Sequence, residues 1–257
     1  MKIQIASDLH LEFLDNRQWI AANPLIPSGD VLLLAGDIIS DKYRDKAENF
    51  YKSVESQFPF IISTMGNHEF YNGTAEYAYP SYSKQMAENH AKLNNKSIVR
   101  DGVKFIVSVL WSHIPDGKYF EVLNGLNDYN FITKRDIGGE DVRITVDTTN
   151  KYHEISLNFI EEELQKKFDE KIVILTHHIP SFKCLSTEFR GDKLNNAFVS
   201  DLDEFIIAHP EINLWVCGHS HDFNDTIVGK TRIVRNPLGY VHVEEEKGFR
   251  RDFVVEV

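Results

Sequence analysis

Five short apolar segments are spread along the chain, and each is followed by a cluster that contains Asp, Asn or His. The segments are rich in Ile, Leu and Val, which is typical of buried β-strands. They cover residues 3–6, 31–35, 60–64, 172–176 and 212–217. In open α/β sheets, ligands gather at the carboxyl ends of the strands. The pattern therefore predicts an α/β protein in which five strand ends bring polar side chains to one place.

The clusters consist of residue types that bind metal ions. They are Ser7-Asp8-Leu9-His10, Gly36-Asp37, Gly66-Asn67-His68-Glu69, His177-His178 and Gly218-His219-Ser220-His221. Any one of them is also typical of a polar turn or a solvated loop after a core strand. The same arrangement five times in one chain favours a common site over five separate turns.

Carboxylate, imidazole and amide ligands together suit Mn, Fe, Zn, Ni or Co. Within the clusters, cysteine occurs only as Cys217, before the glycine of the last one, and this disfavours a structural zinc site. The ligands also outnumber those that a single ion needs. One carboxylate shared by two ions about 3.5–4 Å apart would fit a two-metal hydrolytic site.

Taken in order, the motifs D-x-H, G-D, G-N-H-E, a later His and G-H-x-H resemble those of the calcineurin-like metallophosphoesterase superfamily. They run from Asp8 to His221, which is nearly the whole chain, and as an ordered set they are specific. The resemblance is to small single-domain members of the bacterial and phage type. It implies an α/β fold, a four-layer α/β/β/α sandwich with two central mixed β-sheets.

The resemblance also implies roles for individual residues. The implied ligands are Asp8, His10 and His221 for a first ion, Asn67, His177 and His219 for a second ion, and Asp37 as a bridge between them. His68 corresponds to the family's histidine that protonates the leaving oxygen or steadies the phosphoryl group, and Asn67 and His68 also contact the substrate. If residues 176–178 stay extended, His177 and His178 point to opposite sides. The resemblance selects His177 as the ligand and leaves His178 to packing or to support of the ligands.

Two departures from the family pattern narrow the range of candidate substrates. Ser/Thr protein phosphatases of this superfamily carry G-D-x-x-D-R-G and an arginine before G-N-H-E. Here Ser40 occupies the place of the second aspartate of that motif, and Met65 precedes Gly66. The aspartate that orients the catalytic histidine and the usual phosphate-binding arginines are therefore in question. The pattern disfavours a phosphoprotein phosphatase and favours a small phosphodiester or phosphomonoester, with Arg190, in a polar loop, as a candidate phosphate contact.

The implied function is a metal-dependent phosphoric ester hydrolase in which a metal-bridging hydroxide attacks phosphorus. One alternative is a non-catalytic metal-binding scaffold of the same fold, and another is a nuclease that acts on short nucleic acid. The net charge of −11 disfavours duplex nucleic acid as a partner. The sequence leaves the natural substrate, the native metals and the oligomeric state open.

At 257 residues the chain suits one α/β domain over 1–257. Its least regular stretch, 111–147, is expected to form an insert or cap at the substrate mouth. The chain opens directly into a strand rather than a signal peptide, and its two cysteines suggest no disulfide framework. No apolar stretch approaches the roughly 20 residues that span a bilayer. These features predict a cytoplasmic protein without a membrane partner.

Local patterns predict further elements. Helices are expected over 16–23, 43–58, 82–93 and 157–168, and a β-hairpin over 98–110 around Asp101-Gly102. Ser200 is expected to open a capping box for a short helix. Strands near 226–228, 232–235 and 252–257 are expected to complete the second sheet, and Asn236-Pro237 and Leu238-Gly239 are typical of turns.

For several polar and aromatic side chains, the sequence is consistent with a position at the site and with a position elsewhere. Tyr71, Tyr77 and Tyr79 would either line the mouth of the site or pack beneath a loop. His113 and Asp128, in the segment 111–147, would either reach the site or lie on a loop surface, and the surface is the favoured position.

Overall fold

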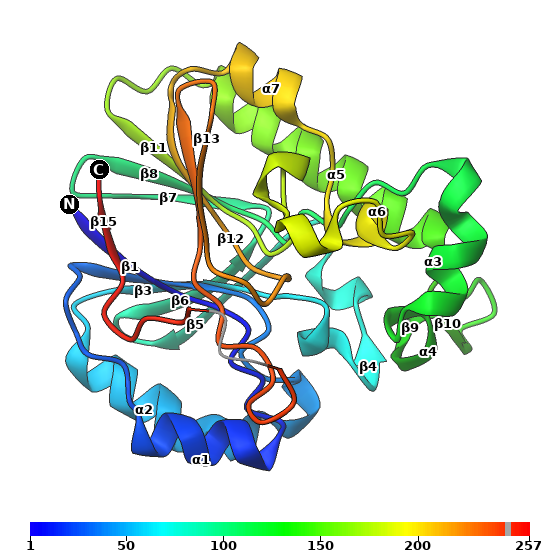
Figure 1. Cartoon of the computed structure of the whole chain (residues 1–257), viewed down its shortest axis with the longest axis horizontal. Coiled ribbons are helices and arrows are strands. Elements are labelled where there is room, and N and C mark those ends of the chain that lie inside the picture. The colour runs from blue at the N-terminus through cyan, green and yellow to red at the C-terminus, as the bar shows by residue number, and fades with distance from the viewer. Residues whose placement is uncertain (245–247) are drawn as a thin grey trace.

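The computed structural model describes residues 1–244 and 248–257. Two six-stranded mixed sheets lie face to face, and helices cover their outer faces, which gives the expected four layers (Figure 1). Helices α1 and α2 lie against one sheet, and α5 and α7 lie against the other. The two ends of the chain meet at one side, where the Met1 amino group donates to the Val257 carbonyl oxygen at 2.9 Å.

The first sheet has the order β15-β1-β2-β3-β6-β5. Its strands are β1 Lys2–Ala6, β2 Val31–Ala35, β3 Ile61–Thr64, β5 Tyr82–Ala87, β6 His90–Asn94 and β15 Val254–Glu256. The second sheet has the order β13-β14-β12-β11-β8-β7. Its strands are β7 Lys96–Arg100, β8 Val103–Val107, β11 Lys171–Leu175, β12 Ile212–Cys217, β13 Asn224–Val228 and β14 Thr231–Arg235.

The helices differ in length and position. They are α1 Leu14–Ala22, α2 Glu48–Gln57, α3 Tyr119–Gly125, α4 Asp128–Phe131, α5 Val146–Gln165, α6 Asn195–Phe198 and α7 Asp203–Ala208. In the described part of the chain, no helix has both the length and the apolar character needed to cross a bilayer.

Alternating side chains build the layers. Leu33 of β2 and Val173 of β11 point into the core between the two sheets. Leu32 of β2 packs toward α1 and α2, and Ile174 of β11 packs toward α5. Because successive residues of a strand face opposite sides, a central strand buried on both faces must be apolar throughout. This explains the uninterrupted apolar segments of the sequence.

The segment 111–147 forms a separate lobe beside the sheets, together with β4 (Figure 1). The lobe contains α3, α4 and a small sheet of order β10-β9-β4. Its strands are β4 Gly73–Thr74, β9 Ile132–Arg135 and β10 Asp141–Arg143. Buried Val122, Ile132 and Ile144 of this lobe share one apolar cluster with Phe70 and Trp111. The segment is therefore more regular than its turn-rich sequence indicates.

Several local predictions are confirmed. The expected helices over 16–23, 43–58 and 157–168 are present as α1, α2 and the second half of α5. Strands β7 and β8 form the expected hairpin, in which Asp101 (φ 46°) and Gly102 (φ 77°) both adopt the left-handed conformation of its turn.

Three local predictions are wrong. Residues 82–93 form the antiparallel pair β5–β6 rather than a helix, because Ala91 and Leu93 alternate into the core between the sheets. Strand β15 pairs with β1 and so completes the first sheet, not the second. Helix α7 begins at Asp203 without a side-chain cap, and the Ser200 hydroxyl instead accepts a hydrogen bond from the backbone N–H of His113 at 2.9 Å.

Candidate metal centre

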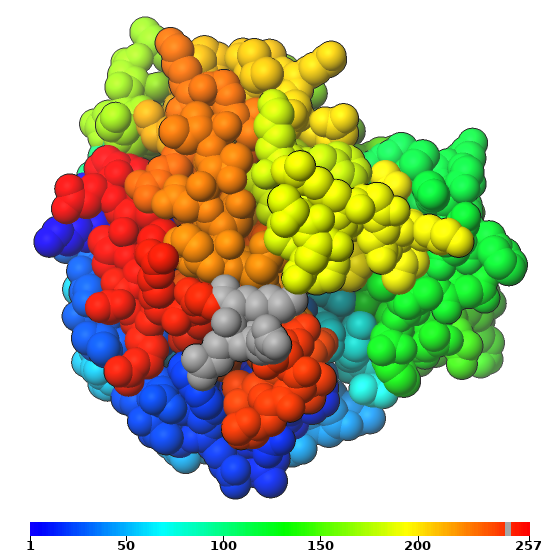
Figure 2. All heavy atoms as spheres, in the orientation of Figure 1, coloured from blue at the N-terminus to red at the C-terminus, as the bar shows by residue number. Residues whose placement is uncertain are grey.

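The strand ends of the two sheets meet at a cavity of about 750 Å³. Figure 2 shows this face of the molecule, with the segments around residue 130 (green), residue 190 (yellow) and residue 240 (orange-red) rising around a recessed area. The candidate ligands lie on the loops that follow β1, β2, β3, β11 and β12. Four of them line the cavity, namely Asp37, Asn67, His219 and His221, and the others lie next to these. The structure therefore brings the five predicted strand ends together.

Asp8, His10 and His221 form one group, with one donor atom of each within 4.8 Å of the others. His10 Nε2 lies 3.1 Å from His221 Nε2, and His221 Nε2 lies 3.8 Å from an Asp8 oxygen. Burial lowers the pKa of His10, so its imidazole is favoured in the neutral form that binds a cation.

Asp37, His177 and His219 form a second group, again with donor atoms within 4.8 Å of one another. His177 Nε2 lies 3.1 Å from both His219 Nδ1 and Asn67 Oδ1. Burial lowers the pKa of His219 well below its usual value. Burial also acts to lower the pKa of His177, but the neighbouring Asp37 outweighs it and raises that pKa to about 10.

Asp37 lies between the two groups. One of its oxygens, Oδ2, is 3.4 Å from His177 Nε2 and 3.9 Å from His10 Nε2. Neighbouring histidines lower the pKa of Asp37 well below its usual value, although burial opposes them. The same carboxylate oxygen thus faces the donors of both groups, as the resemblance implies for the bridging residue.

The loops hold these side chains in backbone conformations that few residues adopt. Asp8, His10, Asp37 and His219 all have positive φ, between 47° and 73°. Such conformations cost free energy and are concentrated at functional sites. Glu69 stabilises the loops that follow β2 and β3, because its carboxylate accepts hydrogen bonds from backbone N–H groups at three positions. These donors are Gly66 (2.7 Å), Asp37 (2.9 Å) and Ile38 (3.1 Å).

Two glycines allow the loops to approach each other. A Cβ atom on Gly66 would lie 2.2 Å from Asp37 Oδ1 and 2.6 Å from the His177 ring. A Cβ atom on Gly218 would lie 2.8 Å from both the Ala35 carbonyl oxygen and Asp8 Oδ2. Any side chain at either position would push the ligand residues apart. The glycines of G-N-H-E and G-H-x-H therefore follow from close packing at the site.

The donor set fits metal ions. In each of two histidine pairs, His10 with His221 and His177 with His219, two ring nitrogens lie 3.1 Å apart, which suits a cation bound by both rings. In two of these histidines an acceptor holds the other ring nitrogen: the Ala35 carbonyl oxygen holds His177 Nδ1 and Glu244 holds His221 Nδ1, both at 2.8 Å. Hydrogen bonds of this kind fix the tautomer and the orientation of a metal-binding imidazole.

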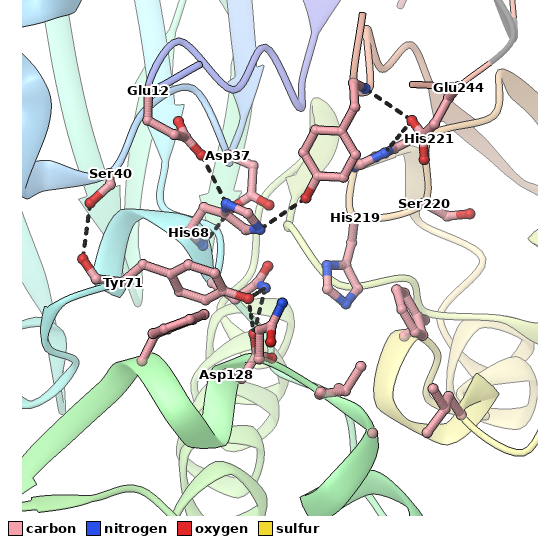
Figure 3. Close-up of a pocket in the computed structure, with 18 of the residues that line it drawn as sticks. Glu12, Asp37, Ser40, His68, Tyr71, Asp128, His219, Ser220, His221 and Glu244 are labelled. Atoms are coloured by element: carbon pink, nitrogen blue, oxygen red, sulfur yellow. Dashed lines mark hydrogen bonds and ion pairs between the residues drawn. The ribbon is translucent and has the colours of Figure 1, made fainter. Parts of the chain in front are cut away.

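His68 lies beside both groups, on the short turn His68–Phe70. Its Nδ1 lies 2.8 Å from Glu12 Oε1, and its Nε2 faces the cavity, 3.3 Å from the hydroxyl of Tyr240 (Figure 3). The ring stacks on Tyr71, with centroids 4.1 Å apart. Burial acts to lower the pKa of His68, but Asp37 and Glu12 outweigh it and raise that pKa to about 9.

The sequence reading missed Glu12 as a partner of His68. The residue lies two positions after His10, so D-L-H-L-E carried a local signal that a carboxylate follows the first motif. Burial acts to raise the pKa of Glu12, but hydrogen bonds with His10 and His68 lower it to about 2. The Ser40 hydroxyl donates instead to the Tyr71 carbonyl oxygen at 3.0 Å. Glu12 thus contacts His68 in a chain that has Ser40 at the position of the family's orienting aspartate.

Asp128 corrects a prediction, because it is buried at the site rather than on a loop surface. It lies on α4 and accepts hydrogen bonds from Asn67 Nδ2 (2.8 Å) and the Tyr71 hydroxyl (2.7 Å). The Asn67 amide nitrogen is therefore turned toward Asp128, and its Oδ1 is turned toward His177. His113, by contrast, is exposed, as expected.

The remaining candidates lie in different surroundings. His178 is buried between Trp111 and His219, with its ring at 85° to that of His177. Arg190 is exposed and is not among the described residues that line the cavity. Of the three tyrosines, Tyr71 lines the cavity. Tyr77 bonds Asp41, and Tyr79 stacks on Tyr152 with centroids 3.9 Å apart.

The cavity extends beyond the candidate ligands. Apolar and aromatic side chains form much of the cavity wall; among them are Phe13, Leu126, Phe131, Leu185, Leu194 and Phe198. Sites that bind small molecules commonly combine such walls with a few polar groups and have volumes of roughly 300–1,000 Å³.

A four-layer α/β/β/α sandwich with metal-ligating groups at its strand ends is the architecture of metal-dependent phosphoesterases. A family model described as calcineurin-like phosphoesterase matches residues 1–223, and the chain belongs to this family. An uncharacterized protein of Acanthamoeba polyphaga mimivirus is 31% identical over 265 residues, a match that covers 93% of this chain and 91% of that protein.

Two further comparisons are more distant. A cell wall protein of Listeria monocytogenes is 24% identical over 215 residues, and the match covers 69% of this chain but 24% of that longer protein. The crystal structure of phosphopantetheinyl hydrolase from Mycobacterium tuberculosis has a TM-score of 0.63 at 15% identity, with 93% of this chain and 89% of that chain covered. This structural likeness supports the fold.

Proposed function

We propose that the protein hydrolyses a small phosphodiester or phosphomonoester at a centre of two metal ions. The proposal rests on the position of Asp37, because one of its two carboxylate oxygens, Oδ2, faces donors of both ligand groups. Asp8, His10 and His221 would hold one ion, and Asn67, His177 and His219 the other. Mn, Fe, Zn, Ni and Co all suit these donors.

Bound ions would supply two effects, a lower pKa for an attacking water and neutralisation of charge on the phosphoryl oxygens. The protein's own residues position the ester. His68 Nε2 faces the cavity and is placed to donate a proton to the leaving oxygen, while Glu12 holds the opposite ring nitrogen. A histidine held in this way keeps one orientation through the reaction.

The cavity supports an ester with an organic group larger than phosphate, because apolar and aromatic side chains form much of its wall. We propose that residues 1–257 act as one catalytic domain and that the lobe 111–147 is its cap. Two observations support this role: Leu126 and Phe131 line the cavity, and Asp128 contacts the candidate ligand Asn67.

Two other functions remain to be compared with this one. A non-catalytic scaffold is expected to lack a metal ligand or the histidine beside the ligands. Here the seven candidate ligands and His68 all meet at this site. A nuclease for duplex nucleic acid would need a basic surface, whereas the chain has a net charge of −11. A nuclease for short nucleic acid is not excluded by this charge and stays an alternative.

The test is hydrolysis of bis(p-nitrophenyl) phosphate beside p-nitrophenyl phosphate, on metal-stripped protein refilled with Mn²⁺. We expect turnover that depends on the added metal. Faster turnover of the diester would identify a phosphodiesterase, and faster turnover of the monoester a phosphatase for small metabolites. Two bound ions without turnover of either ester would contradict the proposal and support the scaffold.

A further inference from the structure

The cavity has few cationic groups that could hold a phosphate ester. Among the described residues that line it, none is a lysine or an arginine. Arg190, the sequence candidate for a phosphate contact, is exposed outside this lining. In the part of the chain that the structure describes, an additional contact with the phosphoryl group would therefore come from neutral donors or histidines near the candidate ligands.

Tyr240 presents such a donor. Its hydroxyl lies 3.3 Å from His68 Nε2, on the side of the histidine that faces the cavity. Within the described part of the chain, this is the hydroxyl's hydrogen-bond partner. Two donors 3.3 Å apart can both reach one oxygen atom at an ordinary hydrogen-bond distance of about 2.8 Å. The pair therefore forms a small donor site beside the two ligand groups.

Aromatic contacts fix the ring of Tyr240. Its centroid lies 4.5 Å from that of His10 and 4.7 Å from that of His221, both candidate ligands of the first ion. The Phe13 ring also packs against it at a right angle, with centroids 5.5 Å apart. Because these contacts involve the ring rather than the hydroxyl, they position the hydroxyl without using its hydrogen bond.

The backbone before Tyr240 is tied to the loop that carries Asp8. Leu238 N–H donates to the Ser7 carbonyl oxygen (3.1 Å), and Gly239 N–H donates to that of Asp8 (3.0 Å). Gly239 has φ 75°, and a Cβ atom there would lie 2.6 Å from Glu244. This turn therefore needs glycine, and it presents the next residue to the site.

Glu244 connects the same turn to a candidate ligand. Its Oε2 accepts from the backbone N–H of Tyr240 at 2.9 Å and lies 2.8 Å from His221 Nδ1 (Figure 3). One carboxylate oxygen thus sets the positions of both His221 and Tyr240. A tyrosine that served only to fill space would not require this link to a candidate metal ligand.

We propose that Tyr240 is a catalytic residue of this site, whose hydroxyl donates a hydrogen bond to an oxygen of the phosphoryl group beside His68 Nε2. This inference rests on the proposed phosphoesterase function. Tyr240 would supply, as a neutral donor, a contact that arginines make in the family's protein phosphatases. A phenol keeps its proton at neutral pH, so it is a donor under ordinary conditions.

The test compares Tyr240→Phe with Tyr152→Phe. The first substitution removes one oxygen and keeps the ring that packs on His10 and His221. The second removes a hydroxyl from a buried tyrosine of α5 that does not line the cavity. For each protein, bound metal, the dissociation constant of inorganic phosphate and kcat/KM for bis(p-nitrophenyl) phosphate are measured after refilling with Mn²⁺.

Hydrogen bonds to charged groups contribute about 1.5–3 kcal/mol, so their loss corresponds to roughly 10- to 100-fold weaker binding. We expect Tyr240→Phe to weaken phosphate binding and lower kcat/KM by about tenfold or more, with metal content unchanged. Tyr152→Phe is expected to match the wild type. Phosphate binding and kcat/KM within twofold of wild type in a fully metal-loaded Tyr240→Phe protein would overturn the inference.

The two proposals fail in different ways. If the wild-type protein binds metal and phosphate but hydrolyses neither ester, the proposed function is wrong. The effect of Tyr240→Phe on phosphate binding still decides whether the hydroxyl contacts the anion. If the wild type hydrolyses esters and the variant equals it in both measurements, the function stands and the role of Tyr240 is wrong.

Discussion

The candidate ligands and the residues that orient them come from different kinds of segment. The ligands follow buried strands directly, in loops that contain close-packed glycines. Two of these loops also donate backbone N–H hydrogen bonds to the Glu69 carboxylate. The orienting residues Glu12, Asp128 and Glu244 come from a loop, from the lobe 111–147 and from the C-terminal turn. The first set belongs to the sequence motifs of the family, whereas the second set lies outside those motifs.

This difference has a physical reason. A metal site needs certain atoms at short distances from one point, and strand ends provide these positions in any member of the fold. An orienting carboxylate only has to reach the far side of a ligand or of a catalytic histidine. Different segments can supply it, and in this protein Glu12 stands against His68 where protein phosphatases use an aspartate at the position of Ser40.

The largest effect is expected from removing a ligand. His219→Ala should abolish binding of one ion and lower kcat by about a thousandfold, since metal-ion stabilisation of the transition state contributes several kcal/mol. The control is the neighbouring His178→Leu, because His178 is equally buried but outside the two ligand groups. Metal content and kcat are measured for both. Loss of metal in His178→Leu but not in His219→Ala would reverse the assignment.

A smaller effect is expected from neutralising Glu12. Glu12→Gln keeps the shape of the side chain but removes the charge beside His68 Nδ1, so kcat should fall by about 10- to 100-fold. The fall should be larger for an alkyl ester than for a p-nitrophenyl ester, whose leaving group does not need a proton. Glu48→Gln, at an exposed pair with Lys52, is the control. Equal losses for both esters would show that Glu12 acts on folding or metal binding instead.

The lobe 111–147 should affect metal binding through one residue. Asp128→Asn removes the charge that turns the Asn67 amide, and we expect metal affinity to fall by about tenfold, as is typical for residues that orient a ligand. Metal binding is followed by calorimetry, with the exposed Asp141→Asn of the same lobe as the control. Unchanged affinity in Asp128→Asn would mean that Asn67 keeps its orientation without the lobe.

The smallest effect is expected at Arg190. The side chain is exposed and lies outside the described lining of the cavity. Arg190→Ala should therefore change KM for either aryl ester by less than twofold. A several-fold rise in KM at constant kcat would show that the loop bends toward the substrate and would restore the arginine as a phosphate contact.

The sequence predicted the strand ends because buried central strands need apolar residues on both faces, and these runs are visible without any partner. The four layers were implied by the family resemblance. Prediction from the sequence failed where a pattern has two structural solutions. The four-residue spacing of Tyr82 and Met86 fits a helix, but the pairing of β6 with β3 selected a hairpin. Strand β15 showed no local sign of which sheet it would join.

The orienting residues were harder to predict for the same reason. Asp128 is 61 residues from its partner Asn67, and Glu12 is 56 residues from His68. No periodicity connects such pairs, and each carboxylate alone is typical of a solvated loop. Only Glu12, placed just after a recognised motif, carried a signal that a reader of the sequence could have used.

The central claim is a two-metal phosphoesterase, and a titration tests it most directly. Metal-stripped protein is titrated with Mn²⁺ while bound metal and hydrolysis of bis(p-nitrophenyl) phosphate are followed together. We expect activity to rise until two ions are bound per chain and then to stay constant, and we expect Asp37→Asn to lose this second step. Saturation at one ion per chain with full activity, or two bound ions with no hydrolysis of any phosphate ester, would contradict the claim.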